Sequence, residues 1–284
     1  MPKTVDEIIN KYYAETAEGL SNEKTPSELN RGEGTEADYY ILKIDLCNST
    51  LFFLRRSSQT YFKIAHVFLS TIDDITRTFG SDARQVEYAG DSVMAYFPNN
   101  YDMALNVLKA AYFARTAMTK MKSLDQTFGN FPFKSRIIMH YGKLILGNIG
   151  PWGDYNLTAI GMPLHVVAKL EKNVQPDNGL ATKEFAAKLS SEEKKTFLTG
   201  NYSESLVEVH DTPAYISNKP SFNYNFGIGD FNLARKQLSP LAALLNPAPQ
   251  AIVAKPRYET KQELVNYNVN WIRLQRFLEG KNRL

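Results

Sequence analysis

The sequence has almost no cysteine and no long apolar run. Cys47 is the single cysteine among 284 residues, so neither an intramolecular disulfide nor a zinc site built on several cysteines can form. No stretch approaches the roughly 18 apolar residues of a membrane-spanning helix, and the opening MPKTVDEIINKYYAET lacks the apolar core of a signal peptide. We therefore expect a soluble, cytoplasmic protein with no membrane partner.

An excess of charge of one sign is also missing. The chain has 33 basic and 30 acidic residues, a net charge of +3, so no global field favours a nucleic-acid partner, and we expect none. Neither a GxxxxGK[ST] phosphate loop nor a GxGxxG turn after a strand occurs. Any nucleotide site must therefore be of another type.

A chain of 284 residues indicates one large domain or one domain with appendages, and its 43% of hydrophobic residues are enough for a sizeable core. We place the main domain at residues 37–240, after an N-terminal helix and linker (1–36) that ends in the linker-like NRGEGTEAD. Residues 241–284 are predicted to be a helical extension, with an amphipathic helix over 259–280 whose apolar face packs on the protein's own core or on a second chain. That face consists of Leu264, Val269, Trp271, Ile272, Leu274 and Phe277.

Between these segments, hydrophobic periodicity predicts strands and helices in turn. Up to residue 150 the order is strand, helix, hairpin, helix and strand, which is the βαββαβ order of a ferredoxin-like α+β fold with an antiparallel sheet. The predicted strands are 39–50, the two arms of the hairpin at Gly90, and two short strands around Gly142 within 134–150; the predicted helices are 61–78, 102–121 and 161–172.

Two aspartates are expected to meet at one edge of this sheet. Asp45 ends the strand YYILKIDL, and Asp91 follows Gly90 at the tip of VEYAGDSVMAYF. The first and third strands of the βαββαβ motif are antiparallel neighbours, so these carboxylates lie close together. A Gly-Asp pair also suits a hairpin tip for purely local reasons. Two adjacent carboxylates need compensation, either from Lys or Arg or from one or two divalent cations such as Mg²⁺.

Polar residues directly after Asp45 add a phosphate-binding element. Asn48, Ser49 and Thr50 suggest a turn that feeds a helix, and backbone N–H groups at such a helix start favour phosphate. Divalent cations beside a backbone phosphate site are typical of a nucleoside triphosphate site.

Taken together, these segments resemble the class III nucleotidyl cyclases, the family of adenylate and guanylate cyclases. KIDLCNST and VEYAGDSVMAYF are similar to its two metal motifs. RIIMHYGKLILGNIG, YNLTAIGMPLHVVAKLEK and NGLATKEFAAKL follow in the family's order, so that the resemblance covers about residues 38–190. Diguanylate cyclases share the general fold, but their Gly-Gly-Asp/Glu-Glu-Phe signature is absent.

The resemblance implies a metal-dependent reaction in a homodimer. Asp45, Asp91 and the backbone carbonyl of Leu46 would bind two Mn²⁺ or Mg²⁺ ions per site, and the sites would form at a head-to-tail interface between two chains. The substrate would be a nucleoside triphosphate, cyclised with release of pyrophosphate.

Further positions of the resemblance concern the base and the phosphates. Glu87 and Thr158 match base-reading positions, and Lys143 matches a phosphate-binding position. Each could equally be a solvated polar residue at a strand end. Glu87 suits a base that offers an N–H donor, which guanine, uracil and cytosine do.

The chain departs from the family on one predicted helix. His165 and Lys169 stand where the resemblance implies an Asn that orients the ribose and an Arg that stabilises the transition state. Their i, i+4 spacing keeps them on one helical face, but Lys lacks the bidentate fork of Arg. Either the enzyme works with a reshaped site, or the domain has lost catalysis and only binds nucleotide and dimerises.

In its reshaped helix and short polar N-terminus the sequence resembles bacterial cyclases that make cyclic UMP or cyclic CMP in anti-phage signalling. This resemblance implies UTP as the favoured substrate and CTP as the next. A purine cyclase that makes cyclic GMP or cyclic AMP is the alternative.

Overall fold

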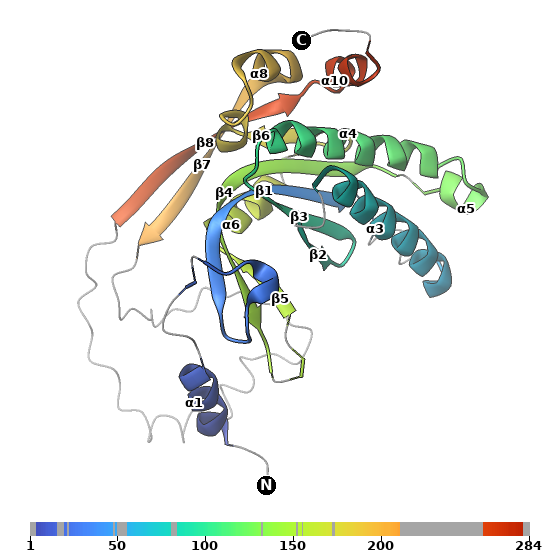
Figure 1. The fold of residues 1–284 in the computed structure, drawn as a ribbon. Helices are drawn as coiled ribbons and strands as arrows, with labels where there is room; N and C mark the ends of the chain where they lie inside the picture. The colour runs from blue at the N-terminus through green and yellow to red at the C-terminus, as the bar shows by residue number, and fades with distance from the viewer. Residues whose placement is uncertain are drawn as a thin grey trace, which may run out of the picture. The chain divides into compact units, whose positions relative to one another are not determined.

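The computed structural model describes residues 4–15, 20–21, 23–47, 49, 56–80, 84–131, 133–151, 153–154, 156–171, 174–210 and 258–280 (Figure 1). The chain divides into two compact units, one of Met1–Glu204 with Leu264–Leu284 and the other of Ser205–Glu263. The candidate site lies in the first unit. Within the described ranges, no helix combines the length and the apolar character needed to cross a bilayer.

One mixed sheet organises the described part of the chain, with the strand order β2-β3-β1-β4-β6-β8-β7 and with β5 paired to β4. Helices α3 (Ser58–Gly80) and α4 (Met103–Met121) connect the first four strands in the predicted βαββαβ order, so the predicted α+β fold is confirmed. The strands are β1 (Gly34–Leu46), β2 (Gln85–Ala89), β3 (Ser92–Pro98), β4 (Ser135–Ile149), β5 (Asn156–Ile160), β6 (Gly179–Thr182), β7 (Leu198–His210) and β8 (Tyr258–Val269).

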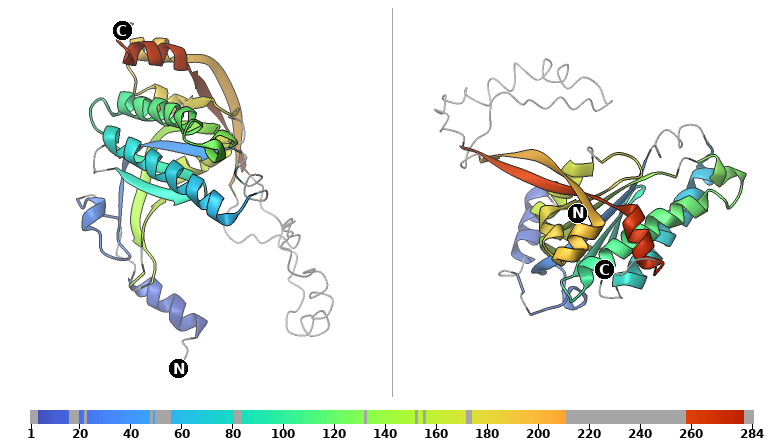
Figure 2. Two further views of the ribbon diagram at one scale, coloured as in Figure 1. Left: turned by 90° about the vertical axis from the view of Figure 1, so that its right-hand side faces the viewer. Right: turned by 90° about the horizontal axis from the view of Figure 1, so that it is seen from above.

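Helices α3 and α4 lie side by side against one face of the sheet (Figure 2). Strand alternation explains the core, because Leu42, Ile44 and Leu46 of β1 are buried with these helices while Lys43 and Asp45 point to the opposite face. The short helices of the described chain are η1 (Pro26–Glu28), α5 (Gln126–Gly129), α7 (Lys183–Ala186) and α8 (Ser191–Phe197), and α1 (Val5–Glu15) precedes the sheet.

Helix α6 (Met162–Glu171) covers the second face of the sheet, and one glycine allows it to approach closely. A Cβ added to Gly142 of β4 would lie 2.7 Å from Pro163 Cγ. Met139, three residues before Gly142 on β4, points to the opposite face and belongs to the core that also contains residues of α3 and α4. Val166 and Leu170 of α6 are buried on the face of Gly142. The face that carries Lys43 and Asp45 is thus the α6 face.

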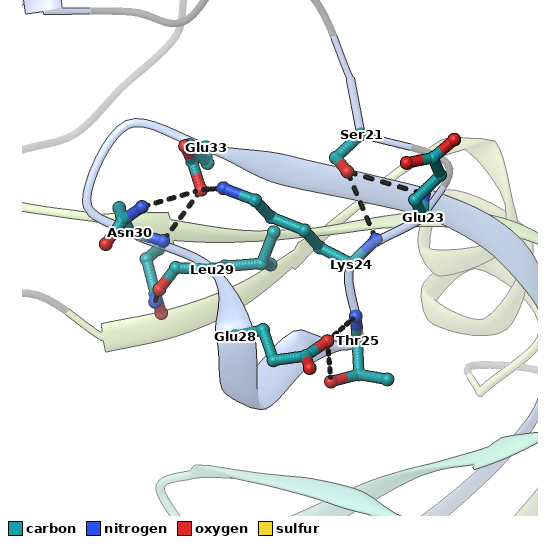
Figure 3. A network of polar contacts seen from close by, with 9 residues as sticks. Ser21, Glu23, Lys24, Thr25, Glu28, Leu29, Asn30 and Glu33 are labelled. Atoms are coloured by element: carbon teal, nitrogen blue, oxygen red, sulfur yellow. Dashed lines mark hydrogen bonds and ion pairs between the residues drawn. The ribbon is translucent and has the colours of Figure 1, made fainter.

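Residues 30–38 differ from the predicted linker, since β1 already begins at Gly34. The preceding loop is fastened to β4: Gly32 N donates to Asn148 O at 2.8 Å, and Asn148 Nδ2 donates to Leu29 O at 2.6 Å. Within the loop, Glu33 Oε2 accepts from Lys24 Nζ at 2.5 Å (Figure 3). This hydrogen bond, together with those from the backbone and side chain of Asn30, lowers the pKa of Glu33 to about 2. These contacts give the loop a defined place on the sheet.

Two predicted elements need correction. The segment 134–150 contains one continuous strand, β4 (Ser135–Ile149), rather than two short strands. The helix predicted over 259–280 is present only as α10 (Trp271–Leu278), because Tyr258–Val269 is strand β8, antiparallel to β6. Asn270 starts α10, with its side-chain oxygen accepting from Arg273 N at 3.2 Å. The predicted domain boundaries stay predictions.

Candidate active site

The two predicted aspartates meet at one edge of the sheet. Asp45 near the end of β1 pairs across strands with Ser92, the residue that follows Asp91. The hairpin tip is tight, with Gly90 at φ +64°, a backbone conformation that glycine adopts without strain. Strand register and turn together place both carboxylates at this edge.

The surroundings of Asp45 disfavour its negative charge. Its side chain is 14% exposed. Desolvation, followed by the charges of Glu171 and Asp91, raises the pKa of Asp45 to about 6, against the opposing effect of Lys43 and Arg136. Three carboxylates (Asp45, Asp91 and Glu171) thus lie around two cationic side chains, Lys43 and Arg136.

Part of the compensation is the ion pair that the sequence left open as an alternative to a metal. Arg136 lies directly opposite Asp45 on β4, and its Nη1 is 3.3 Å from Asp45 Oδ2. Its Nε also donates to Val174 O at 3.0 Å, so the guanidinium is shared with the backbone.

The remaining negative charge fits a divalent cation. In the part of the chain that the structure describes, no three His, Cys, Asp or Glu side chains form a metal-binding group. Mg²⁺ is suited to a site of one or two carboxylates completed by water and substrate phosphates. Asp45 and Asp91 supply such a pair, and the carbonyl of Leu46, whose side chain is buried in the core, stays a predicted third ligand.

A second ion pair joins the site to α6, and sequence reasoning missed it. Lys43 Nζ contacts the carboxylate of Glu171 at the end of α6. Lys43 could have been found, because it stands two residues before Asp45 in an apolar strand and so shares its face. Glu171 and Arg136 gave no such indication, since their placement depends on helix packing and on the register of β4.

The helix α6 presents His165 and Lys169 as its sequence spacing predicts. Both residues are exposed, while Val166, Val167 and Leu170 are buried on the other side of the helix. The two side chains therefore share an outward face, which a substrate or a second chain can reach.

Of the two predicted base-reading residues, Glu87 contacts the strand that carries Thr158. Glu87 Oε1 accepts from the backbone N of Ala159 at 2.8 Å, and its Oε2 accepts from the hydroxyl of Tyr96 at 2.6 Å. Thr158 directly precedes Ala159 on β5, and its Oγ1 donates to Asn156 O at 3.3 Å. Burial and the hydrogen bond to Glu87 raise the pKa of Tyr96 above its ordinary range.

Of the predicted phosphate-binding residues, Lys143 lies away from the aspartates in a single chain. Lys143 is 62% exposed, lies opposite Asp38 on β1 and has its Nζ 3.5 Å from Glu36 Oε2, so a single chain does not bring it to the end of β1. Ser49 is buried. Asn48 and Thr50 lie outside the described residues.

Solved structures with the same architecture are cyclase catalytic domains. The guanylyl cyclase Cya2 matches with a TM-score of 0.58 and 14% identity over 83% of this chain and 93% of its own. The adenylyl cyclase CyaB from P. aeruginosa matches with 0.54 and 13% identity over 84% and 95%. The guanylate cyclase domain of RhGC from Catenaria anguillulae, in complex with GTP, matches with 0.51 and 13% identity over 83% and 98%.

This chain has the class III cyclase fold. No protein-family model and no curated protein matches its sequence. The cyclase fold accounts for the antiparallel β1 and β3 at the centre of the predicted motif, which bring Asp45 and Asp91 together.

Proposed function

We propose that this chain is a nucleotidyl cyclase that converts a pyrimidine nucleoside triphosphate, UTP first and CTP next, into a 3′,5′-cyclic nucleotide and pyrophosphate. The observation that carries the proposal is the pair of carboxylates, Asp45 and Asp91, at neighbouring strand ends of a cyclase fold. The resemblance to anti-phage cyclases supports a role for the product as a signal in bacterial defence.

Asp45, Asp91 and the carbonyl of Leu46 would hold two Mn²⁺ or Mg²⁺ ions. Such ions lower the pKa of the ribose 3′-hydroxyl and neutralise charge on the phosphates. The 3′-oxygen forms a bond to the α-phosphorus as the bond from that phosphorus to the bridging β-phosphate oxygen breaks. The hydroxyl proton passes to solvent, and pyrophosphate leaves.

Residues from a second chain complete this proposed site in a head-to-tail homodimer. Lys169 would place a positive charge beside the reacting phosphate, where charge grows in the transition state, and His165 would hydrogen-bond the ribose. Lys143 and the residues after Asp45 would hold the remaining phosphates. The outward position of His165 and Lys169 on α6 supports contribution across an interface.

Glu87 supports a base that presents an N–H donor. Uracil offers its N3–H and cytosine its exocyclic amine. Adenine has an exocyclic amine too, so Glu87 disfavours adenine only where the carboxylate lies opposite N1, which presents a lone pair. Thr158 lies next to the residue that contacts Glu87 and would complete the pocket for a small base.

A direct test incubates the purified full-length protein with Mn²⁺ and equal ATP, GTP, CTP and UTP, and separates the products by chromatography. We expect one cyclic pyrimidine nucleotide, which disappears in Asp91→Asn. The matched control is Asp74→Asn, because Asp74 is an exposed carboxylate on α3, and it should retain full activity.

Each other outcome has a definite meaning. Cyclic AMP or cyclic GMP as the main product would keep the cyclase and contradict the pyrimidine assignment. No product from any nucleotide would contradict the cyclase and favour a nucleotide-binding dimerisation module, with His165 and Lys169 as the explanation.

A further inference from the structure

We propose that Tyr96 is a specificity-determining positioning residue, because its hydroxyl and the backbone N–H of Ala159 together fix the carboxylate of Glu87 in one orientation. The hydrogen bonds belong to the structure itself. Their consequence for substrate choice rests on the proposed function, in which Glu87 reads the base.

The brace joins the β2–β3 hairpin to β5, a strand that pairs with neither β2 nor β3. Glu87 comes from β2 and Tyr96 from β3, whereas Ala159 belongs to β5, which pairs with β4. The strand order places β3 and β1 between β2 and β4. The carboxylate of Glu87 therefore links the β2–β3 hairpin to the strand that leads directly into α6.

Tyr96 is built as a rigid donor. Its side chain has no exposed surface, and it lies opposite Ile41 on β1 and Gln85 on β2. A buried aromatic ring held between two neighbouring strands has little rotamer freedom, and its single polar atom is 2.6 Å from Glu87 Oε2. The position of that carboxylate is thereby set by the core of the sheet.

The brace leaves Glu87 able to accept further hydrogen bonds. A carboxylate oxygen can accept about two hydrogen bonds, and the brace uses one on Oε1 and one on Oε2. The remaining lone pairs can meet N–H donors of a base. Since both existing partners donate, the carboxylate stays an acceptor toward the substrate as well.

Rigidity is what makes this contact selective. A mobile carboxylate can rotate away from a base that presents a lone pair, and little affinity is lost. A fixed carboxylate cannot rotate away, so a base that presents a lone pair leaves two acceptors facing each other. Sites of this kind discriminate strongly between bases. Removing the hydroxyl of Tyr96 should therefore loosen base selectivity without touching the reacting groups.

The test compares kcat/KM for UTP and ATP in the full-length wild type and in Tyr96→Phe, which keeps the ring and removes the hydroxyl. We expect the ratio of kcat/KM for UTP to that for ATP to fall by about tenfold or more, mainly through KM. Tyr88→Phe is the matched control, because Tyr88 is half exposed and its hydroxyl donates to the carboxylate of Asp73 instead. It should leave the ratio unchanged.

A purely structural brace gives a different result, in which kcat/KM falls by the same factor for every nucleotide. That outcome, or an unchanged ratio in Tyr96→Phe, would overturn the inference while a working wild type upholds the proposed function. If the wild type forms no cyclic product, the proposed function fails by itself. In that case the ratio of the affinities for 3′-deoxy-UTP and 3′-deoxy-ATP is measured by calorimetry instead. Equal affinities in the wild type would overturn the inference too.

Discussion

Two polar residues on the α6 face of the sheet show how burial sets protonation. Desolvation, with a smaller effect of the neighbouring carboxylates, raises the pKa of Asp45 to about 6. His140 on β4 is only 5% exposed, and desolvation lowers its pKa to about 4 despite the nearby carboxylate of Glu184. Its Nδ1 lies 2.8 Å from Thr182 Oγ1, which also accepts from Phe185 N at the start of α7. The neutral imidazole is thus part of a small hydrogen-bonded group.

Protonation of His140 should make stability depend on pH. The unfolded chain binds the proton near its ordinary pKa of about 6.5, whereas the folded chain resists protonation until about pH 4. Between these values the unfolded state binds more protons, so the free energy of unfolding falls as the pH falls. We expect His140 to account for a loss of about 2 kcal/mol between pH 7.5 and 5, measured by urea unfolding at both pH values.

The variant His140→Gln separates the contribution of His140 from that of the carboxylates. Between pH 7.5 and 5, its free energy of unfolding should fall by about 2 kcal/mol less than that of the wild type. His66→Gln serves as the control, since His66 is exposed on α3. Equal losses in His140→Gln and in the wild type would contradict the assignment.

Single residues of the candidate site were predictable where strand period and turn chemistry decide their place. Asp45 and Asp91 were found in this way, because neighbouring strands of a known motif bring their ends together. Lys43 was overlooked, although a charge at an alternate position of an apolar strand is itself an indication. Arg136 and Glu171 depend on long-range register and helix packing, which local patterns do not encode.

At the scale of elements, α6 is held at both of its ends. Near its start, Pro163 packs on Gly142, and Glu87 bonds the backbone of Ala159 just before the helix. At its other end, Glu171 pairs with Lys43 of β1. The helix that carries His165 and Lys169 is therefore fixed relative to the strand that carries Asp45.

A double-mutant cycle of Lys43→Met and Glu171→Gln should measure how strongly this ion pair stabilises the fold. The side chains are 12% and 24% exposed, so the charges are poorly solvated, and each loses its closest opposite charge when the other is removed. We expect a coupling energy of about 1–3 kcal/mol in chemical unfolding.

The exposed pair Lys63 and Asp125 provides the comparison. Its atoms are 2.8 Å apart, and its side chains are 58% and 40% exposed, so solvent screens the interaction and the coupling should be about 0.5 kcal/mol or less. A similar coupling for both pairs would show that Lys43 and Glu171 do not anchor α6.

Helices and strands were predictable wherever a single hydrophobic periodicity, helical or strand-like, dominated a segment. Helices α3 and α4 carry regular apolar stripes and were predicted within a few residues. Before α10, Val265, Tyr267 and Val269 alternate with asparagines, a strand pattern that the apolar residues of the following helix obscured. Gly142 was taken as a break in β4, but it allows close packing of Pro163. A glycine that is needed for a tertiary contact cannot be told from a strand break by local periodicity.

At the scale of the whole molecule, the proposed head-to-tail dimer predicts complementation between inactive variants. Asp45→Asn removes one half of a shared site and Lys169→Ala removes the other. A heterodimer of the two keeps one intact site, so random co-assembly should restore about a quarter of wild-type activity. Co-expression of the two differently tagged chains, followed by pyrophosphate release assays, measures this.

Co-expression of Asp45→Asn with Asp91→Asn is the matched control, since both variants damage the same half and every site stays defective. An absence of complementation in the first pair of co-expressed chains would place a complete site within one chain and refute the shared arrangement. Complementation in the control pair would show that Asp45 and Asp91 of one chain serve different sites, which contradicts the proposed metal pair.

The ion pair between Lys43 and Glu171 acquires a further meaning in such a dimer. Lys43 stands two residues from Asp45, and Glu171 stands two residues from Lys169. Asp45 and Lys169 of one chain would belong to different active sites, so the ion pair between Lys43 and Glu171 would connect the two sites. Binding of a nucleotide and its cations at one active site would change the electrostatic field at Glu171. The position of α6, which carries Lys169 to the other active site, would change with it. The two centres would then communicate, and turnover at one would depend on occupancy of its twin.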